Sequence, residues 1–335
     1  MKILFFAVFS ALTFSCNSAQ KTVVPKEKNV EYANTITARE LKKHLFVYAD
    51  DAMEGRMTGT KGQRMAAEYI RDFYKKEGIA AAPGTTDYFQ EIPASYFAGK
   101  KDPKTSENVV AYIKGAEKPD EVIVISAHLD HVGMDKNGNV FNGADDDGSG
   151  TVSILEIAQA FQKAVKDGHP PKRTIVFLHV TGEEIGLYGS RYYTEHPLFP
   201  IKNTVCNLNI DMIGRIDPDK KENPDYLYLI GSNKISQELQ DVSTEVNNKY
   251  THLELDYKYD DPEDPNRFYY RSDHYNFAKN NIPIIFYFNG VHEDYHKITD
   301  TPDKIEYELM AKRAKLIFLT AWEIANRENR ISLNQ

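Results

Sequence analysis

The stretch VIVIS at residues 122–126, followed one residue later by His128-Leu129-Asp130, indicates the fold of this chain. A short run that is apolar and largely β-branched is typical of a strand buried on both faces of its sheet. Similar runs occur at residues 109–113 and 174–180. Strands of this kind lie in sheets that helices cover on both sides, so these runs predict an α/β protein.

Helical patterns alternate with the strand candidates. Residues 151–165 carry apolar side chains at helical spacing. Residues 61–77 predict a second helix, which Gly78 ends at the position that helices favour for glycine. Further helices are expected at residues 38–51 and 303–326, and further strands at residues 205–210, 226–230 and 284–288. The alternation predicts a doubly wound, mainly parallel mixed sheet flanked by helices.

The composition is that of a globular protein. Of the 335 residues, 41% are hydrophobic and 27% are charged, and a chain of this length can bury a sizeable core. The formal net charge is −8. Because nucleic acids and anionic membrane surfaces attract basic proteins, this acidic balance predicts no nucleic-acid partner.

Residues 1–15 have the pattern of a signal segment. Lys2 precedes an apolar stretch at residues 3–14, which is too short to span a membrane as a stable helix. Residues 13–16, TFSC, resemble a bacterial lipoprotein processing site, after which Cys16 would carry the lipid; ordinary cleavage near Ala19 is the alternative. We therefore expect an exported protein, periplasmic or anchored to the outer membrane through Cys16, or else secreted.

The remainder is expected to form a tether and one domain. Residues 16–32 are polar and include Pro25, as in a tether. A single catalytic domain is expected at residues 33–335. Cys206 is the only cysteine besides Cys16, so no disulfide is expected within the mature domain.

Side chains that can bind metals follow the strand candidates. His128, Glu183-Glu184 and Asp211 each lie just after one of these runs. In open α/β sheets the carboxyl ends of the strands meet at one edge, so these side chains should converge. Asp146 lies in the run NGADDDGSG at residues 142–150, where a glycine-rich turn starts a helix. Imidazole and carboxylate ligands with one spare carboxylate are what metal-assisted hydrolysis needs.

Each motif has an alternative interpretation when taken alone. A His-x-Asp pair is usually a hydrogen-bonded pair, and Glu183-Glu184 could be a solvated acidic turn. Asp145-Asp146-Asp147-Gly148 could belong to a calcium loop, but the Asp-x-Asp-x-Asp-Gly spacing is absent and an apolar helix begins at once. For His131 and His274 we expect outer-shell or substrate contacts and no metal binding.

Together these motifs resemble the co-catalytic di-zinc exopeptidases of the bacterial leucine aminopeptidase and glutamate carboxypeptidase type, peptidase clan MH. The likeness includes further segments: residues 53–60 (MEGRMTGT), 108–111 (NVVA), 209–214 (NIDMIG), 272–274 (SDH) and 294–296 (DYH). It covers nearly all of the chain after the leader. The short connection between Ile92 and Lys101 leaves no room for the accessory domain that some relatives carry there.

The resemblance implies two zinc ions bound as a bridged pair. His128 and Asp211 would bind one zinc, and Glu184 and His296 would bind the other. Asp146 would bridge them. Metal ions about 3.5–4 Å apart can share a hydroxide that attacks the scissile carbonyl.

The resemblance also implies roles beside the metals. Glu183 would be the general base, which takes a proton from the bridging water and returns it to the leaving amine. Asp130 would accept a hydrogen bond from the second ring nitrogen of His128. A cis peptide bond often follows the bridging aspartate, here Asp146-Asp147. Candidates for contacts with the oxyanion or the substrate are Tyr295, Ser272 and Asp273.

The expected activity is that of a zinc-dependent aminopeptidase acting on peptides. A carboxypeptidase on the same metal core is the first alternative, and it would need arginines to bind the terminal carboxylate. Available arginines are Arg215, Arg267 and Arg271. A glutaminyl cyclase shares the fold, but residues 146–150 and 184–190 look more like those of the peptidases. A non-catalytic binding module would be expected to have lost ligands, and none is lost.

A rival motif lies near the C-terminus. His292-Glu293-Asp294-Tyr295-His296 fits the His-Glu-x-x-His pattern of single-zinc endopeptidases, in which both histidines lie on one helix face. Asn289-Gly290 precedes the segment and Thr299-Asp300-Thr301-Pro302 follows it, so a sustained helix is not expected. This hypothesis would make Glu293 the general base and leave the upstream motifs without a role.

Overall fold

The computed structural model describes residues 27–100 and 104–335. Its centre is a nine-stranded sheet in the order β1-β3-β5-β4-β6-β9-β7-β8, with β2 pairing with β3 outside this path. The strands are β1 (Ala80–Ala81), β2 (Phe89–Ile92), β3 (Ser106–Ile113), β4 (Lys118–His128), β5 (Arg173–Val180), β6 (Thr204–Ile210), β7 (Tyr226–Ile230), β8 (Glu254–Asp256) and β9 (Ile284–Phe288). The predicted signal segment, Cys16 and the first part of the tether lie outside the described residues.

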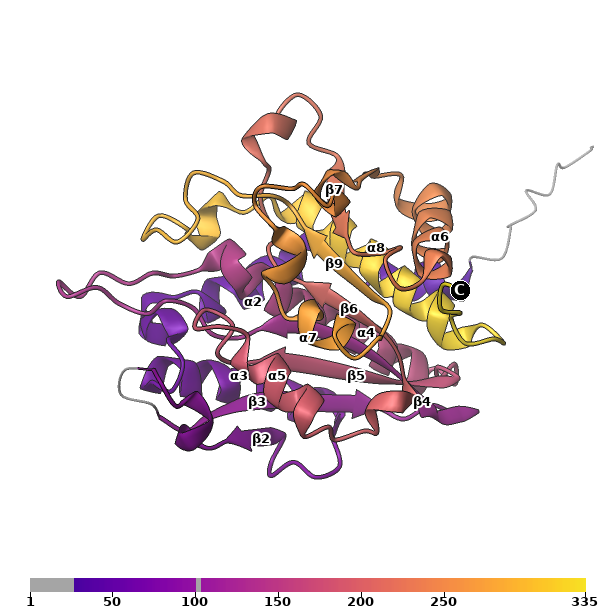
Figure 1. The fold of residues 1–335 in the computed structure, drawn as a ribbon, viewed down its shortest axis with the longest axis horizontal. Helices are drawn as coiled ribbons and strands as arrows, with labels where there is room; N and C mark the ends of the chain where they lie inside the picture. Colours follow the sequence, from indigo (N-terminus) through magenta and orange to yellow (C-terminus); the bar gives the residue numbers. More distant parts are fainter. Residues whose placement is uncertain (1–26, 101–103) are drawn as a thin grey trace, which may run out of the picture.

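The four central strands, β5, β4, β6 and β9, run parallel, and the flanking strands β3 and β7 are antiparallel to them (Figure 1). The predicted α/β fold with a mixed sheet is thereby confirmed. The register pairs His128 with Val180 and Ile210 with Tyr287, so the carboxyl ends of these strands lie side by side. Residues that follow the strands therefore meet at one edge of the sheet.

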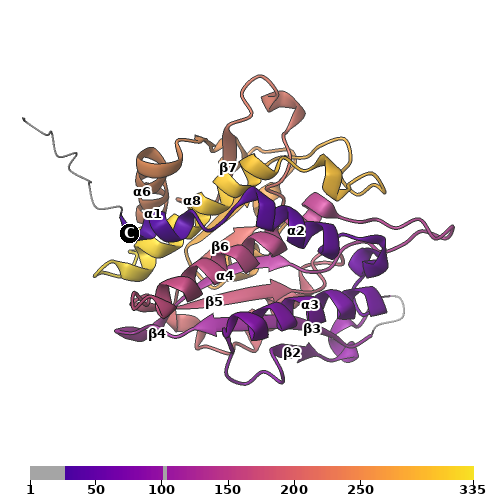
Figure 2. The same ribbon diagram turned by 180° about the vertical axis from the view of Figure 1, so that it is seen from behind.

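Helices cover both faces of the sheet. They are α1 (Lys28–Ala33), α2 (Ala38–Tyr48), α3 (Lys61–Glu77), α4 (Gly150–Lys166), α5 (Tyr188–Glu195), α6 (Gln237–Val246), α7 (His274–Ala278) and α8 (Tyr307–Asn326). Helices α5 and α7 lie on the face seen in Figure 1, and α2, α3, α4 and α8 on the face seen in Figure 2. No helix in the described part of the chain is long and apolar enough to cross a membrane.

The stretch VIVIS places alternate side chains in two cores. Ile123 and Ile125 of β4 belong to the larger cluster of buried residues, which includes residues of α2, α3, α4 and α8. Val122 and Val124 belong to a second cluster with Tyr193 of α5. A strand that alternates between two cores must be apolar at every position, which explains the uninterrupted run.

Several boundaries differ from those predicted. Tyr32 was expected in the tether, but it belongs to α1 and is fully buried. Helix α2 ends at Tyr48 because the Asp50 side chain accepts a hydrogen bond from the backbone N–H of Ala52 and starts a 3-10 helix, η1 (Asp51–Arg56). Helix α8 begins at Tyr307, four residues late, because Ile305 has an extended backbone.

Candidate metal centre

The five predicted ligands come together at the carboxyl edge of the central strands. His128 ends β4, Asp211 follows β6, and Glu184 follows β5. Asp146 lies in the turn that leads into α4, and His296 lies in the loop after β9. Parallel neighbouring strands bring these segments, which are far apart in sequence, to one place.

Asp146 lies between the two histidines. Its Oδ1 is 3.2 Å from Nε2 of His128, and its Oδ2 is 2.9 Å from Nε2 of His296. The Nε2 atom of His128 is also 3.7 Å from Oδ1 of Asp211, and that of His296 is 3.2 Å from Oε2 of Glu184. Each oxygen of Asp146 thus faces a separate histidine–carboxylate pair, as a bridging ligand requires.

The donor set fits zinc, which binds imidazole nitrogen and carboxylate oxygen. The Oδ2 atom of Asp146 and Oε1 of Glu184 are buried and have no hydrogen-bond partner among the described residues. The Nδ1 atom of His128 lies 3.0 Å from a backbone carbonyl, which can only accept, so Nε2 is the ring nitrogen that is left to bind a metal. Ligand atoms of Asp146 and Glu184 lie within 4.8 Å of each other.

The clustered carboxylates shift the pKa values of the histidines. Burial lowers the pKa of His296, but Asp146 and Glu184 outweigh that effect and raise it to about 10. Burial likewise lowers the pKa of His128, but Asp146 and Asp211 outweigh that effect and raise it well above its ordinary value. Such shifts reveal a strongly negative potential, which also favours a divalent cation.

Glu183 remains outside this set of contacts. Its carboxylate makes no hydrogen bond or ion pair with any described residue, while its backbone N–H donates to Oδ1 of Asp130 at 3.2 Å. Burial raises the pKa of Glu183 well above its ordinary value, and the charges of Asp211 and Glu184 raise it further. A free carboxylate with a raised pKa beside a metal centre is suited to proton transfer.

The hydrogen bond predicted between His128 and Asp130 has a different acceptor atom. The Nδ1 atom of His128 donates to the backbone carbonyl of Asp130 at 3.0 Å, and the carboxylate Oδ1 is 3.8 Å away. The Asp130 carboxylate instead accepts from the Glu183 backbone and from the Thr58 hydroxyl, the latter at 2.7 Å. Asp130 therefore orients a ligand through its main chain and the candidate base through its side chain.

Asp147 is a further carboxylate near His128, but its oxygens are occupied. Its Oδ2 accepts from the backbone N–H of His128 at 3.1 Å, and its Oδ1 accepts from those of Gly150 and Met212 at 3.0 and 3.1 Å. These bonds assign Asp147 a structural role. The peptide bond between Asp146 and Asp147 is cis, as the resemblance implied.

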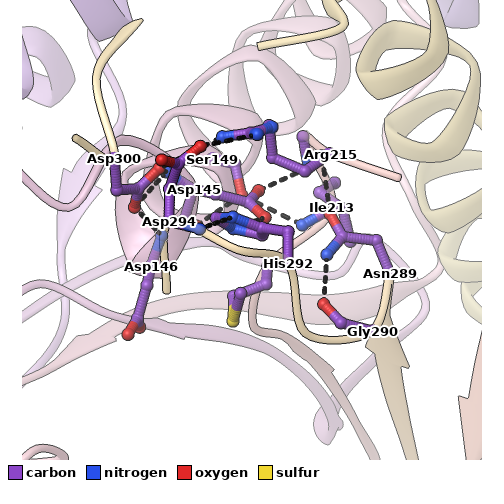
Figure 3. Close-up of polar contacts among 12 residues, drawn as sticks. Asp145, Asp146, Ser149, Ile213, Arg215, Asn289, Gly290, His292, Asp294 and Asp300 are labelled. Atoms are coloured by element: carbon purple, nitrogen blue, oxygen red, sulfur yellow. Dashed lines mark hydrogen bonds and ion pairs between the residues drawn. The ribbon is translucent and has the colours of Figure 1, made fainter. Parts of the chain in front are cut away.

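A buried network lies behind Asp146 (Figure 3). The Asp300 carboxylate accepts hydrogen bonds from the backbone N–H groups of Asp145 and Asp146, at 3.0 and 3.2 Å. Arg215 pairs with Asp294 at 2.9 Å in the same network. Figure 3 shows the Asp146 carboxylate pointing away from these groups. The network therefore holds the backbone of Asp146 and leaves its side chain to the centre.

The rival motif at residues 292–296 does not form an endopeptidase site. These residues form turns, and the Nε2 atom of His292 points to Oδ2 of Asp145 at 3.2 Å (Figure 3). The Glu293 side chain is 63% exposed. Because His296 alone of this motif reaches the other ligands, the hypothesis that Glu293 acts as a general base is wrong.

Sequence reasoning assigned no role to Arg56, which clamps the turn before Asp146. Its buried guanidinium donates to the carbonyls of Tyr48, Asn142 and Gly143 at 3.2, 2.6 and 2.8 Å. The close packing of this segment against the loop after β4 requires glycine at position 55, since a Cβ there would lie 2.1 Å from a backbone oxygen of that loop. The segment MEGRMTGT thus fixes the turn before Asp146 and in this way supports the metal centre.

A small pocket, half of whose lining residues are aromatic, opens beside Asp211. Its other lining residues are Met212, Phe268, Arg271, Phe286, Phe288, Val291 and Tyr295. The Tyr295 ring also stacks on that of His296, with centroids 3.9 Å apart. This pocket is the natural place for an apolar side chain of a bound molecule.

Ser272 and Asp273 lie beneath the site and are fully buried. The Ser272 hydroxyl accepts a hydrogen bond from Asn209 at 2.9 Å. The Asp273 carboxylate has no hydrogen-bond partner among the described residues, and burial raises its pKa to about 7. Their positions favour a supporting role over the predicted border of the substrate pocket.

Fold and site together define an α/β protein with a buried histidine–carboxylate centre. The chain belongs to Peptidase family M28, whose model matches residues 108–321. It is 33% identical, over 173 residues, to a probable zinc metalloprotease of Pyrenophora teres f. teres, a match that covers 49% of this chain and 33% of that protein. It is 31% identical, over 206 residues, to probable leucine aminopeptidase 2 of Aspergillus oryzae, covering 57% of this chain and 35% of that protein.

The chain thus spans about a third of the length of these curated relatives. Among solved structures it is similar to the LapA aminopeptidase of Legionella pneumophila, with a TM-score of 0.70 at 20% identity. That match covers 96% of this chain and 81% of the other. At this level of identity, the likeness supports the fold.

Proposed function

We propose that this chain is a zinc-dependent aminopeptidase that hydrolyses N-terminal residues from peptides. The observation that carries the proposal is the free Glu183 carboxylate beside five converging ligands, of which Asp146 faces both histidines. Membership of Peptidase family M28 supports a peptidase, and the relatives described as a zinc metalloprotease and a leucine aminopeptidase support the metal and the reaction.

The residues divide the chemistry among them. His128 and Asp211 would hold one zinc ion, Glu184 and His296 a second, and Asp146 would contact both. When bound, zinc lowers the pKa of water and polarises a carbonyl group. Glu183 takes a proton from the attacking water and delivers it to the leaving amine.

The pocket beside Asp211 would receive the side chain of the N-terminal residue. Its phenylalanine rings favour a large apolar side chain. The relative described as a leucine aminopeptidase favours an aminopeptidase over a carboxypeptidase.

One observation keeps a carboxypeptidase as the second candidate. Arg215 is occupied by Asp294, but Arg271 is exposed, lines the pocket and has no carboxylate partner among the described residues. Its guanidinium stands over the Phe268 ring at 5.0 Å, within reach of a ligand carboxylate. A peptide whose terminal carboxylate is bound by Arg271 would lose residues from its carboxyl end.

Product analysis by mass spectrometry separates these functions. Zinc-loaded protein is incubated with matched peptides that have free ends, a blocked amino terminus or an N-terminal glutamine. Stepwise loss from the amino end, abolished by the block and by a chelator, is the expected result. Loss from the carboxyl end would establish the carboxypeptidase, and loss of ammonia from glutamine would establish a cyclase. Absence of any hydrolysis would refute the proposal.

We also propose that the chain is exported and anchored through a lipid on Cys16. The sequence at residues 13–16 supports this anchor. Metabolic labelling with a fatty acid tests it by comparing the native chain with its Cys16→Ser variant. Labelling of both chains, or of neither, would contradict the anchor.

A further inference from the structure

A third histidine, His131, lies against the proposed metal centre. Its Nδ1 atom is 2.7 Å from Oε1 of Glu184 and 3.8 Å from Oδ2 of Asp146. The side chain is fully buried, and its ring stands edge-on to that of His296 with centroids 5.7 Å apart. The sequence had predicted only an outer-shell or substrate contact for this residue.

The close approach of His131 to Glu184 would be an ion pair if the imidazole were protonated, but it lacks hydrogen-bond geometry. Both ring nitrogens of His131 and Oε1 of Glu184 lack a hydrogen-bond partner among the described residues. A buried polar group without a partner is costly, so this arrangement needs another explanation. Two ligands of one cation approach each other in this way, because each aims its lone pair at the ion.

The local chain is built to hold the His131 ring in this position. A Cβ atom at Gly143 would lie 2.5 Å from two ring atoms of His131, so only glycine leaves room for the imidazole there. The backbone N–H of His131 donates to the Arg56 carbonyl at 3.2 Å. Contacts outside the centre therefore fix the ring beside Glu184.

We propose that His131 is a ligand, through Nδ1, of the zinc ion on the Glu184 side. The inference rests on the proposed metal centre. The Glu184 side would then have four protein ligands: Asp146, Glu184, His296 and His131. The Asp211 side would have three: Asp146, His128 and Asp211.

This asymmetry has a chemical consequence. Zinc is usually four-coordinate, so with four protein ligands the ion on the Glu184 side would share a water only by expanding to five ligands, whereas three protein ligands leave a position open. The metal on the Glu184 side would bind more tightly and leave last on chelation. The metal on the Asp211 side, next to the aromatic pocket, would keep the open position for the substrate.

Metal binding itself tests the inference. Zinc per chain is measured by mass spectrometry after equilibration with chelator-buffered free zinc, for the wild type and for His131→Ala. Because the loss of an outer-shell partner already costs about 10–100-fold in metal affinity, loss of a ligand should weaken the tighter step by more than about 100-fold. With cobalt in place of zinc, the visible spectrum of the tighter site should change as well.

A second variant separates a ligand from a hydrogen-bond donor. His131→Asn places an amide nitrogen near the position of Nδ1, where it can donate to Glu184 but binds zinc poorly. The ligand role predicts that His131→Asn stays as weak as His131→Ala. His252→Asn, which changes an exposed histidine, is the matched control and should retain both binding steps.

Thermal unfolding of the metal-free proteins shows whether the substitution itself impairs folding. Removal of the buried imidazole leaves a cavity and takes away the contact with Glu184, so the Tm of metal-free His131→Ala should fall while unfolding stays cooperative. Unchanged zinc affinity in His131→Ala, or full rescue by His131→Asn, would overturn the inference while the metal centre stands. A wild type that binds no zinc would overturn the metal centre and the inference together.

Discussion

Adjacent carboxylates, Glu183 and Glu184, lie in opposite environments. Burial and Asp146 act to raise the pKa of Glu184, but its contacts with His131 and His296 hold it below the ordinary value. Burial raises the pKa of Glu183 well above its ordinary value. Two carboxyl groups whose pKa values are pushed apart take different roles, so one can stay ionised as a ligand while the other exchanges a proton.

The first prediction concerns Glu183→Gln. An amide cannot accept the proton of the attacking water, so kcat should fall about 10²–10⁴-fold. Zinc content should stay that of the wild type, because the Glu183 carboxylate makes no hydrogen bond or ion pair with the predicted ligands among the described residues. Steady-state kinetics and metal analysis measure the two effects. Glu293→Gln, an exposed glutamate of the discarded motif, is the control and should keep full turnover; near-wild-type turnover in Glu183→Gln would refute the assignment.

The second prediction concerns Asp130→Ala. The carbonyl that orients His128 remains, so zinc affinity should change little. The backbone N–H of Glu183 and the Thr58 hydroxyl lose their acceptor, so kcat should fall about 10–100-fold. Kinetics at saturating zinc and zinc titration together give the answer. A loss of zinc affinity that parallels the loss of kcat would show that the carboxylate, rather than the carbonyl, orients His128.

At the level of single residues, sequence motifs predicted which side chains converge but not all of their contacts. His128 and Asp211 could be placed because each follows an apolar run. The partners of Arg56 and His131 could not be predicted, because both depend on how loops from different strands pack. The acceptor atom on Asp130 likewise depends on a backbone conformation that no residue type specifies.

At the level of elements, the turn before α4 is held from several sides. Arg56 of η1 binds the carbonyls of Asn142 and Gly143, and Asp300 binds the N–H groups of Asp145 and Asp146. The turn carries the bridging candidate and has hydrogen bonds of its own, such as that from Gly148 to Gly143, but the N–H groups of Asp145 and Asp146 depend on Asp300. Its shape therefore also depends on neighbouring segments, which makes it sensitive to changes in them.

The third prediction tests this dependence with Asp300→Ala. Two buried backbone N–H groups lose a charged acceptor, so the free energy of unfolding of the metal-free protein should fall by about 2–4 kcal/mol. Urea denaturation measures the change. Asp300→Asn should recover part of the loss, because its amide oxygen can still accept. Asp303→Ala, an exposed carboxylate nearby, should stay within about 0.5 kcal/mol of the wild type. An equal effect of Asp300→Ala and Asp303→Ala would contradict the role given to Asp300.

Strands and helices with a strong apolar pattern could be predicted, and those without one could not. The central strands are buried on both faces, so they can be recognised in the sequence as continuous apolar runs. Strands β1 and β8 have two and three residues at the rim of the sheet, too few for any periodicity. The end of α2 was missed because one side-chain hydrogen bond, from Ala52 to Asp50, decides it.

At the scale of the whole molecule, the sheet serves both the core and the site. Its parallel centre requires helices on both faces, which bury the strands, and it also aligns the strand ends that carry the ligands. Buried polar residues on the same strands must then find their hydrogen-bond partners inside the core. His179 on β5 is such a residue, since it is fully buried and its Nε2 lies 2.7 Å from the Tyr74 hydroxyl.

The fourth prediction is a pH dependence of stability caused by His179. Burial lowers its pKa to about 3, whereas an unfolded histidine titrates near 6.5. The folded state therefore binds fewer protons, so its stability is fully present above about pH 6.5 and is lost as the pH falls toward 3. Between pH 7.5 and 5 this one group should remove about 2 kcal/mol from the free energy of unfolding.

His179→Gln isolates this contribution, because glutamine can keep the bond to Tyr74 but does not titrate. Urea denaturation of both proteins with a chelator present gives the free energy of unfolding at each pH. The difference, wild type minus variant, should shrink by about 2 kcal/mol from pH 7.5 to pH 5, since His179 is the only titrating group that the pair does not share. A difference that stays constant with pH would mean that the buried ring takes up a proton as readily as a histidine in water.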